Sequence, residues 1–118
     1  MKLSLNTATI KKQWNLAQAI EGFEAAPGTE HRQCDSRLHL AIAAASGSQR
    51  TMVAVTQVQA DLDEMLQAIP VLSVNIAHST AQHRAIVKAI LRGEARKASR
   101  VMAEHCEDTA ALLRGLLV

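Results

Sequence analysis

Asp35 and His39 lie four residues apart, within the segment 34–39. If this segment is helical, their carboxylate and imidazole share one face of the helix. Two further histidines, His83 and His105, occupy apolar positions of later predicted helices. Carboxylates and imidazoles are ordinary ligands of divalent transition metals. This pattern predicts that an acid and three histidines face inward toward a single point, where a metal ion could bind.

The composition favours a helical fold. The chain has 118 residues, of which 48% are apolar, and its only aromatic residues are Trp14 and Phe23. Closely packed helices suit this mixture better than a β-sandwich, which would need more aromatic and β-branched residues in alternating runs. The length suits one domain with its own core. We therefore predict an all-α fold and a single domain over residues 1–118.

The charge and the cysteines limit the possible partners and the compartment. A net charge of +2 is too small to indicate nucleic acid or an anionic membrane as a partner. No apolar run approaches the roughly 20 residues that a membrane span requires, and the N-terminus lacks a signal-peptide pattern. Cys34 and Cys106 do not form a disulfide framework, so we expect two semi-buried free thiols in a cytoplasmic protein.

The spacing of apolar residues predicts five helices. Their approximate bounds are Thr7 to Ala25, Thr29 to Gly47, Ser48 to Ala68, Ser79 to Gly93, and Glu94 to Leu116. The run Val71 to Ala77 is too short to assign by periodicity. The first helix could be mistaken for half of a helix-turn-helix, but no second helix follows it in register. Short connections between the helices imply an antiparallel bundle of about five helices.

Apolar stripes indicate which face of each helix is inward. The clearest stripe lies on the third helix and consists of Met52, Val55, Val58, Leu62, Met65 and Ile69. On the fourth helix, His83 lies on the same side as Ile86, Val87 and Ile90. On the fifth, His105 falls between Met102 and Thr109. Both histidines thus replace expected aliphatic residues.

Other interpretations of the histidines remain open. A single histidine on an apolar face is more often a core residue with a hydrogen-bond partner than a metal ligand. His31, one turn before Asp35, could be a ligand or part of a lid, whereas His78 is predicted to be a surface residue at a loop-to-helix boundary. Cys34 and Cys106 adjoin two candidate ligands, but adjacent helical residues point about 100° apart. Neither thiol can therefore easily share the direction of the candidate ligands.

Four segments of the chain also carry a family resemblance. They read Asp35-Ser-Arg-Leu-His39, Ala43-Ala-Ala-Ser-Gly-Ser48, His83-Arg-Ala-Ile-Val-Lys-Ala-Ile90 with Gly93-Glu94 after it, and Ala98-Ser-Arg-Val-Met102-Ala-Glu-His105. From about Ile10 to its C-terminus the chain resembles the FCD domain, the C-terminal effector-binding domain of FadR-subfamily GntR transcription regulators. The spacing of the last two histidines is also similar to that of the family.

The resemblance implies a fold, a metal and an effector. In the family, an Asp and three His residues bind a divalent metal, commonly zinc or nickel, inside an antiparallel bundle, and small carboxylates bind beside the metal in several members. By resemblance, Asp35, His39, His83 and His105 are the metal ligands here. The expected function is that of a ligand-sensing domain of a transcription regulator rather than an enzyme.

The chain departs from the family pattern in several places. Leu38 stands where the family usually has Phe, and Ser48 where it usually has Asn, which could alter the choice of effector. The N-terminal winged helix-turn-helix is missing, and the first helix of the family's bundle also looks absent. The sequence is therefore either a piece of a regulator or a shortened natural protein. We do not expect this chain alone to bind DNA specifically, and an exposed apolar strip would favour a homodimer.

Three functions remain compatible with the predicted site. A divalent ion with one carboxylate and three neutral imidazoles has a net charge of about +1, which attracts an organic anion to any open coordination position. Zinc bound by three histidines could instead activate water in a hydrolase, with His31 or Glu104 as a conceivable acid or base. A tetrahedral ion with all four ligands would be purely structural.

Overall fold

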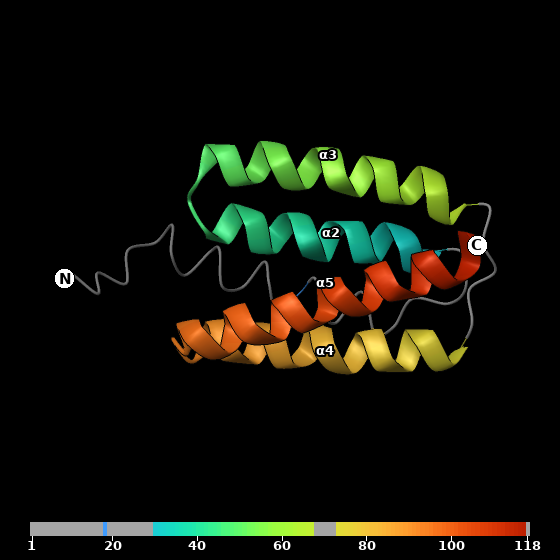
Figure 1. Ribbon diagram of the computed structural model, residues 1–118. Helices are drawn as coiled ribbons and strands as arrows, with labels where there is room; N and C mark the ends of the chain where they lie inside the picture. The colour runs from blue at the N-terminus through green and yellow to red at the C-terminus, as the bar shows by residue number, and fades with distance from the viewer. Residues whose placement is uncertain (1–17, 19–29, 68–72, 118) are drawn as a thin grey trace. The chain divides into compact units, whose positions relative to one another are not determined.

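The computed structural model describes residue 18 and residues 30–67 and 73–117. These residues form the helices α2 (Glu30–Ala45), α3 (Gln49–Leu66), α4 (Ser73–Leu91) and α5 (Ala95–Leu117), shown in Figure 1. No strand occurs in these ranges. The prediction of an all-α fold is confirmed. The chain divides into two compact units, Met1–Ala68 and Ile69–Val118, and each contains one helical hairpin.

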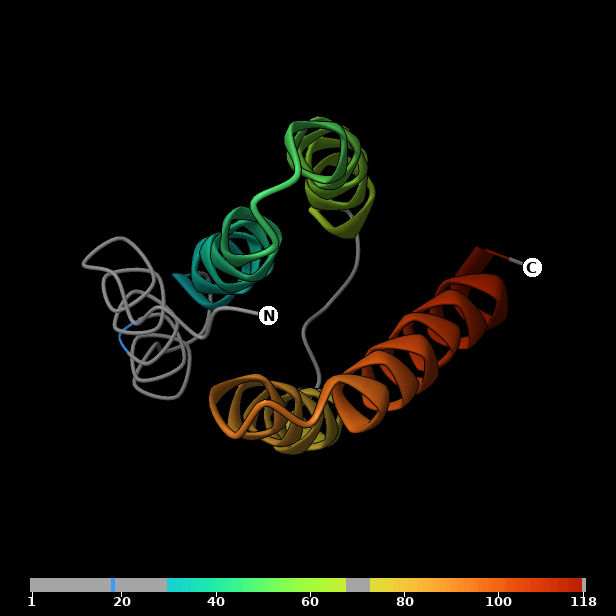
Figure 2. The ribbon, with the colours of Figure 1, turned by 90° about the vertical axis from the view of Figure 1, so that its left-hand side faces the viewer.

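A short turn joins α2 to α3 in the first unit. Gly47 adopts a φ of 71°, a left-handed conformation that glycine reaches without steric cost, and it reverses the chain after α2. Ser48 then caps α3, because its hydroxyl oxygen accepts a hydrogen bond from the Thr51 N–H at 3.2 Å. The boundary predicted at Gly47 and Ser48 is therefore correct. The two helices run antiparallel and pack on each other (Figures 1 and 2).

Polar side chains connect α2 to α3. The Ser36 hydroxyl lies 2.9 Å from each carboxylate oxygen of Asp63 and donates its single hydrogen to that carboxylate. The amide nitrogen of Gln59 donates to the Ser36 oxygen at 3.3 Å, and Gln59 is buried. Leu38 and Ala43 are buried apolar residues of α2. The hydrogen bonds between α2 and α3 favour one register of the two helices, and the buried apolar residues add to the packing.

The inward face predicted for α3 is partly wrong. Val58 and Met65 belong to the predicted apolar stripe, yet they are 53% and 40% exposed, and Val53 is 60% exposed. The buried side chain of α3 is the neighbouring Gln59. The side-chain amide of Gln59 can be buried because it donates a hydrogen bond to Ser36. The apolar pattern of the sequence does not predict a buried glutamine at this position.

The second unit consists of α4 and α5, joined by a tight turn at Gly93. The Glu94 N–H donates to the Ala89 carbonyl at 2.9 Å, and the Gly93 N–H donates to the Ile90 carbonyl at 3.1 Å. This pair of bonds, with a φ of 73° at Gly93, is a Schellman motif. The turn returns the chain antiparallel, and α5 inclines away from α4 toward its C-terminal end (Figures 1 and 2).

Apolar residues on facing sides of α4 and α5 form the core of this unit. They are Ile86, Val87, Ala89 and Val101. Burying a side chain such as Ile86 contributes roughly 1.5–3 kcal/mol. The apolar face predicted for α4 is confirmed, since His83, Ile86 and Val87 are all buried.

The predicted start of one helix is wrong, and another predicted helix lies outside the described residues. α4 begins at Ser73, whereas the prediction placed its start near Ser79, so part of the unassigned run 71–77 is in fact the first turns of α4. A short apolar run has no periodicity of its own, and only its continuity with the helix that follows decides its state. The predicted first helix, 7–25, lies outside the described residues except for Gln18.

Candidate metal centre

One acid–histidine pair lies on α2 in the first unit. The Nε2 atom of His39 is 3.5 Å from an Oδ1 oxygen of Asp35, one helical turn earlier. Their side chains are 13% and 24% exposed, so both are largely shielded from water. The four-residue spacing does bring both groups to one face, as the sequence predicts. A carboxylate and an imidazole at this separation can serve as neighbouring ligands of one ion.

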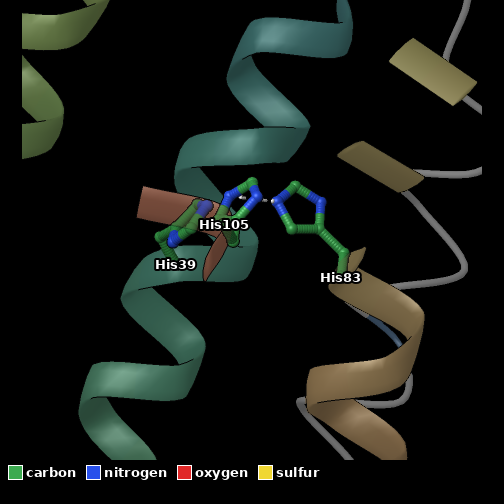
Figure 3. Close-up of side chains that lie close together, drawn as sticks. All are labelled: His39, His83 and His105. Carbon is green, nitrogen blue, oxygen red and sulfur yellow. Dashed lines mark hydrogen bonds between the residues drawn. The ribbon is translucent and has the colours of Figure 1, made fainter. Parts of the chain in front are cut away.

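A histidine pair lies between α4 and α5 in the second unit. The Nε2 atoms of His83 and His105 are 3.0 Å apart, and the rings meet edge to face with centroids 4.5 Å apart. Figure 3 shows this contact as a dashed line. His83 is 0% exposed and His105 is 5% exposed. Two buried imidazoles thus direct the same ring nitrogen toward a common point.

The separation of these nitrogens suits a shared metal ion. Zinc–imidazole bonds are about 2.0–2.1 Å long. Two such nitrogens bound at a right angle lie about 3 Å apart, and at a tetrahedral angle about 3.4 Å apart. The observed 3.0 Å is close to both separations, so these two nitrogens lie near enough to bind one ion.

A chain of hydrogen bonds leads from His105 to the surface of the second unit. The Nδ1 atom of His105 is 2.8 Å from the side-chain oxygen of Gln82. The Gln82 amide nitrogen donates to Asp108 Oδ2 at 2.7 Å, and His78 Nε2 lies 2.8 Å from the same oxygen. Hydrogen bonds from His78 and then from Gln82 hold the pKa of the Asp108 carboxyl below its ordinary value. Asp108 is therefore ionised at neutral pH.

The remaining histidines differ from their predicted settings. His78 is exposed, as predicted, but it lies within the second turn of α4 rather than at a helix boundary, and it pairs with Asp108 on α5. His31 is in the first turn of α2, and its predicted exposure lies outside the described side chains.

The thiols and the candidate catalytic acid are not placed at this centre. Cys34 is half-buried, as expected, whereas Cys106 is exposed and not semi-buried. Partial burial raises the pKa of the Cys106 thiol, and the Glu107 carboxylate raises that pKa further. Glu104 is on the exposed side of α5, where it accepts a hydrogen bond from Arg100 at 3.0 Å. Among the described residues, no contact supports an acid–base role for Glu104.

Sequence analysis missed Gln82 and Asp108. Neither occupies an apolar stripe, and hydrogen bonds between polar residues of two helices leave no periodic signal. A weaker signal was present: His78 and Gln82 are four residues apart, and His105 and Asp108 are three apart, so each pair shares a helical face.

Comparison with known protein families shows the family of this chain. The sequence matches the FCD domain family over residues 7–108, which is most of the chain. This chain belongs to the FCD domain family. The resemblance inferred from the histidine segments is thereby confirmed. No curated protein and no solved structure matches the chain.

Membership in this family defines the general role of the chain. FCD domains are all-α regulatory domains of transcription factors, and they often bind metal ions. Membership in the family therefore implies effector binding of the kind found in GntR-type regulators. Within the described part of this FCD domain, none of the helices is both long and apolar enough to cross a membrane.

Proposed function

We propose that this chain is the metal-containing, ligand-sensing domain of a GntR-type transcription regulator. In this proposal, Asp35, His39, His83 and His105 hold one divalent ion, and a small organic acid binds at its open positions. The observation that carries the proposal is the buried His83–His105 pair with its Nε2 atoms 3.0 Å apart. Each of the three histidines offers one ring nitrogen as a ligand atom.

The donor set fits zinc or nickel. Imidazole is a good ligand for both ions, and the single carboxylate adds a hard oxygen donor. Asp35 and His39 would supply neighbouring ligands from α2, since their atoms are 3.5 Å apart. The ion would then connect the α2 pair to the α4–α5 pair. When bound, it would supply a positive centre for an anion, because one carboxylate leaves a charge of about +1 in a shielded site.

A six-coordinate ion also leaves room for an effector. Four protein ligands fill four positions and leave two for water or for a carboxylate. A tetrahedral ion, in contrast, would be filled by the four protein ligands and would leave no position for an effector. Binding of the acid would shift the helices that carry the ligands and so change the regulator's affinity for DNA.

Isothermal titration calorimetry of the metal-loaded chain with a panel of small mono-, di- and tricarboxylates tests the sensor function. We expect saturable binding of at least one acid, and the same acid should not bind after the metal is removed with a chelator. The variant H105A, loaded under the same conditions, is the matched control and should not bind the acid. If the metal-loaded chain binds none of these acids and displaces no bound water on their addition, the ion is structural and the sensor proposal is wrong.

The proposal includes the partners of the chain. We expect a homodimer in the cytoplasm, because FCD domains belong to regulators that assemble as oligomers. The exposed apolar side chains Val53, Val58 and Met65 of α3 are consistent with such an interface. We expect no sequence-specific DNA binding by this chain alone. Analytical ultracentrifugation and a gel-shift assay measure these two properties.

A further inference from the structure

The orientation of the Gln82 amide determines which nitrogen of His105 carries a proton. A neutral imidazole has one N–H donor and one nitrogen with a lone pair, and only the latter can bind a metal. His105 uses Nδ1 toward the Gln82 side chain at 2.8 Å and Nε2 toward His83 at 3.0 Å. If the Gln82 oxygen faces Nδ1, then Nδ1 must donate, and Nε2 of the neutral ring keeps its lone pair.

Asp108 fixes the orientation of that amide. A carboxylate can only accept hydrogen bonds, so the Gln82 group that lies 2.7 Å from Asp108 Oδ2 must be the amide nitrogen. The amide oxygen is then the atom that faces His105. The reversed amide would place its oxygen against the carboxylate and its NH2 group against Nδ1. That arrangement would favour the tautomer with the proton on Nε2, which cannot bind a metal through that atom.

We propose that Gln82, with its amide held by Asp108, is a positioning residue that keeps His105 in the tautomer with an unprotonated Nε2. Hydrogen bonds from the second nitrogen of a metal-binding histidine commonly orient the ring in this way. The part of this inference that concerns metal affinity rests on the proposed function. The tautomer itself is a property of the metal-free chain.

The same argument assigns a different tautomer to His83. Since Nε2 of neutral His105 has a lone pair, the 3.0 Å contact requires Nε2 of His83 to be the donor. The metal-free chain therefore holds His105 ready for a metal ion, whereas His83 must move its proton from Nε2 to the buried Nδ1. The two histidines are not equivalent, although they share one contact.

Long-range 1H–15N correlation spectra of the metal-free, 15N-histidine-labelled chain at neutral pH test the proposal. In these spectra a ring nitrogen that carries a proton is distinguished from one that does not. We expect His105 to be protonated on Nδ1 and His83 on Nε2. In the variant Q82L, which has no acceptor for Nδ1, the His105 signals should move toward an averaged or reversed pattern. If His105 in Q82L keeps its wild-type pattern, the proposal is wrong.

Two further variants separate positioning from a general effect on folding. H78A removes a different partner of Asp108 but leaves the Gln82 amide in place, so it should keep the His105 tautomer. D108N allows the Gln82 amide to reverse and should give a mixed pattern, which makes the test independent of whether Q82L folds. An H78A spectrum like that of Q82L would contradict the proposal.

Titration with zinc connects the tautomer to the metal. We expect Q82L to bind zinc about 10–100-fold more weakly than the wild-type chain, and H78A to bind it about equally well. If the wild-type chain binds no zinc but the spectra follow the expected pattern, the proposed function fails and the positioning role of Gln82 stands. If zinc binds and Q82L changes neither the spectra nor the affinity, the positioning role fails and the proposed function stands.

Discussion

The Nε2 atoms of His83 and His105 lie 3.0 Å apart in the interior of the α4–α5 hairpin. Burying two polar rings costs free energy unless each has partners. A hydrogen bond between them offsets part of this cost in the metal-free chain. The same separation is close to that of two nitrogen ligands of one ion, and binding would require His83 to move its proton from Nε2 to Nδ1.

Replacing His105 with Ala should abolish metal binding. We expect the purified wild-type chain to contain about one equivalent of zinc or nickel and H105A to contain almost none. The control H78A removes an exposed histidine of the same unit and should retain the metal. Inductively coupled plasma mass spectrometry measures the metal content. Equal metal content in H105A and the wild-type chain would contradict the ligand assignment.

Metal binding should also stabilise the fold. A ligand that binds only the folded state at about 100 times its Kd contributes about 2.7 kcal/mol. We therefore expect a chelator to lower the Tm of the wild-type chain, and re-addition of zinc to restore it. The Tm of H105A should respond to neither addition. Differential scanning calorimetry measures these changes. A wild-type Tm that does not change when the chelator is added would argue against a bound ion.

Removing the Ser36 hydroxyl should destabilise the α2–α3 hairpin. The hydroxyl donates to Asp63 and accepts from Gln59, so S36A leaves both partners without this contact. A hydrogen bond to a charged group contributes about 1.5–3 kcal/mol, and partial exposure reduces this to about 1–2 kcal/mol here. Urea unfolding of the metal-free chain measures the loss.

The matched comparison for this contact is D63A against D61A. Asp63 contacts Ser36 of the other helix, whereas Asp61 accepts a hydrogen bond from Gln57 of its own helix. We expect D63A to cost about as much as S36A and D61A to cost less than about 0.5 kcal/mol. Equal losses for the two aspartates would show that the interhelical contact contributes little.

The backbone of Gly93 should make this residue intolerant of alanine. Its φ of 73° disfavours any side chain, although no neighbouring atom would meet a Cβ there. We expect G93A to lower the free energy of unfolding by about 1–2 kcal/mol. G115A is the control, because Gly115 is in α5 with open space around it, and this change should leave stability unchanged or raise it by up to about 1 kcal/mol.

Stability should depend on the ionisation of Asp108 at acid pH. The folded state lowers the pKa of this carboxyl below its value in the unfolded chain, which is about 3.9. Its contribution is therefore fully present above the unfolded pKa and is lost as the pH falls through the folded pKa. The difference in unfolding free energy between the wild-type chain and D108N should shrink as the pH falls from 5 to about 2. Denaturant unfolding at stepped pH measures it, and a difference that grows on acidification would contradict this.

The Cys106 thiol should react slowly despite its exposure. Burial, and then the Glu107 carboxylate, raise the pKa of this thiol above its ordinary value, so it holds less reactive thiolate at neutral pH than an ordinary thiol. We expect the pH midpoint of its reaction with iodoacetamide to exceed that of a model cysteine peptide, and E107Q to lower the midpoint. Mass spectrometry of the modified peptide distinguishes Cys106 from Cys34.

The sequence predicts the fold best where local residues determine it. Gly47, Ser48 and Gly93 mark the ends and starts of helices through their own conformations or hydrogen bonds, and these boundaries agree with the structure. The start of α4 was missed, because the apolar run before Ser79 has no distinct period. On α3, the pattern favoured Val58 over Gln59, since periodicity does not show that Ser36 faces the glutamine.

Part of the candidate site can also be predicted from the sequence, and part cannot. Helical spacing predicts that Asp35 and His39 share a face, and the apolar stripes predict that His83 and His105 are buried. That Gln82 and Asp108 orient His105 depends on contacts between two helices, which spacing along one helix cannot reveal. Metal content tests the proposed ligands, and the histidine spectra test the supporting role of Gln82 and Asp108.

The turn at Gly93 also fixes the height at which the two rings meet. His83 and His105 are about ten and about twelve residues from the glycine on opposite arms, and a helix rises about 1.5 Å per residue, so the rings reach nearly the same level. One residue inserted into α5 before His105 would rotate His105 by about 100° around the helix axis and turn its ring away from His83. The number of helical residues between Gly93 and each histidine therefore determines whether the two rings meet.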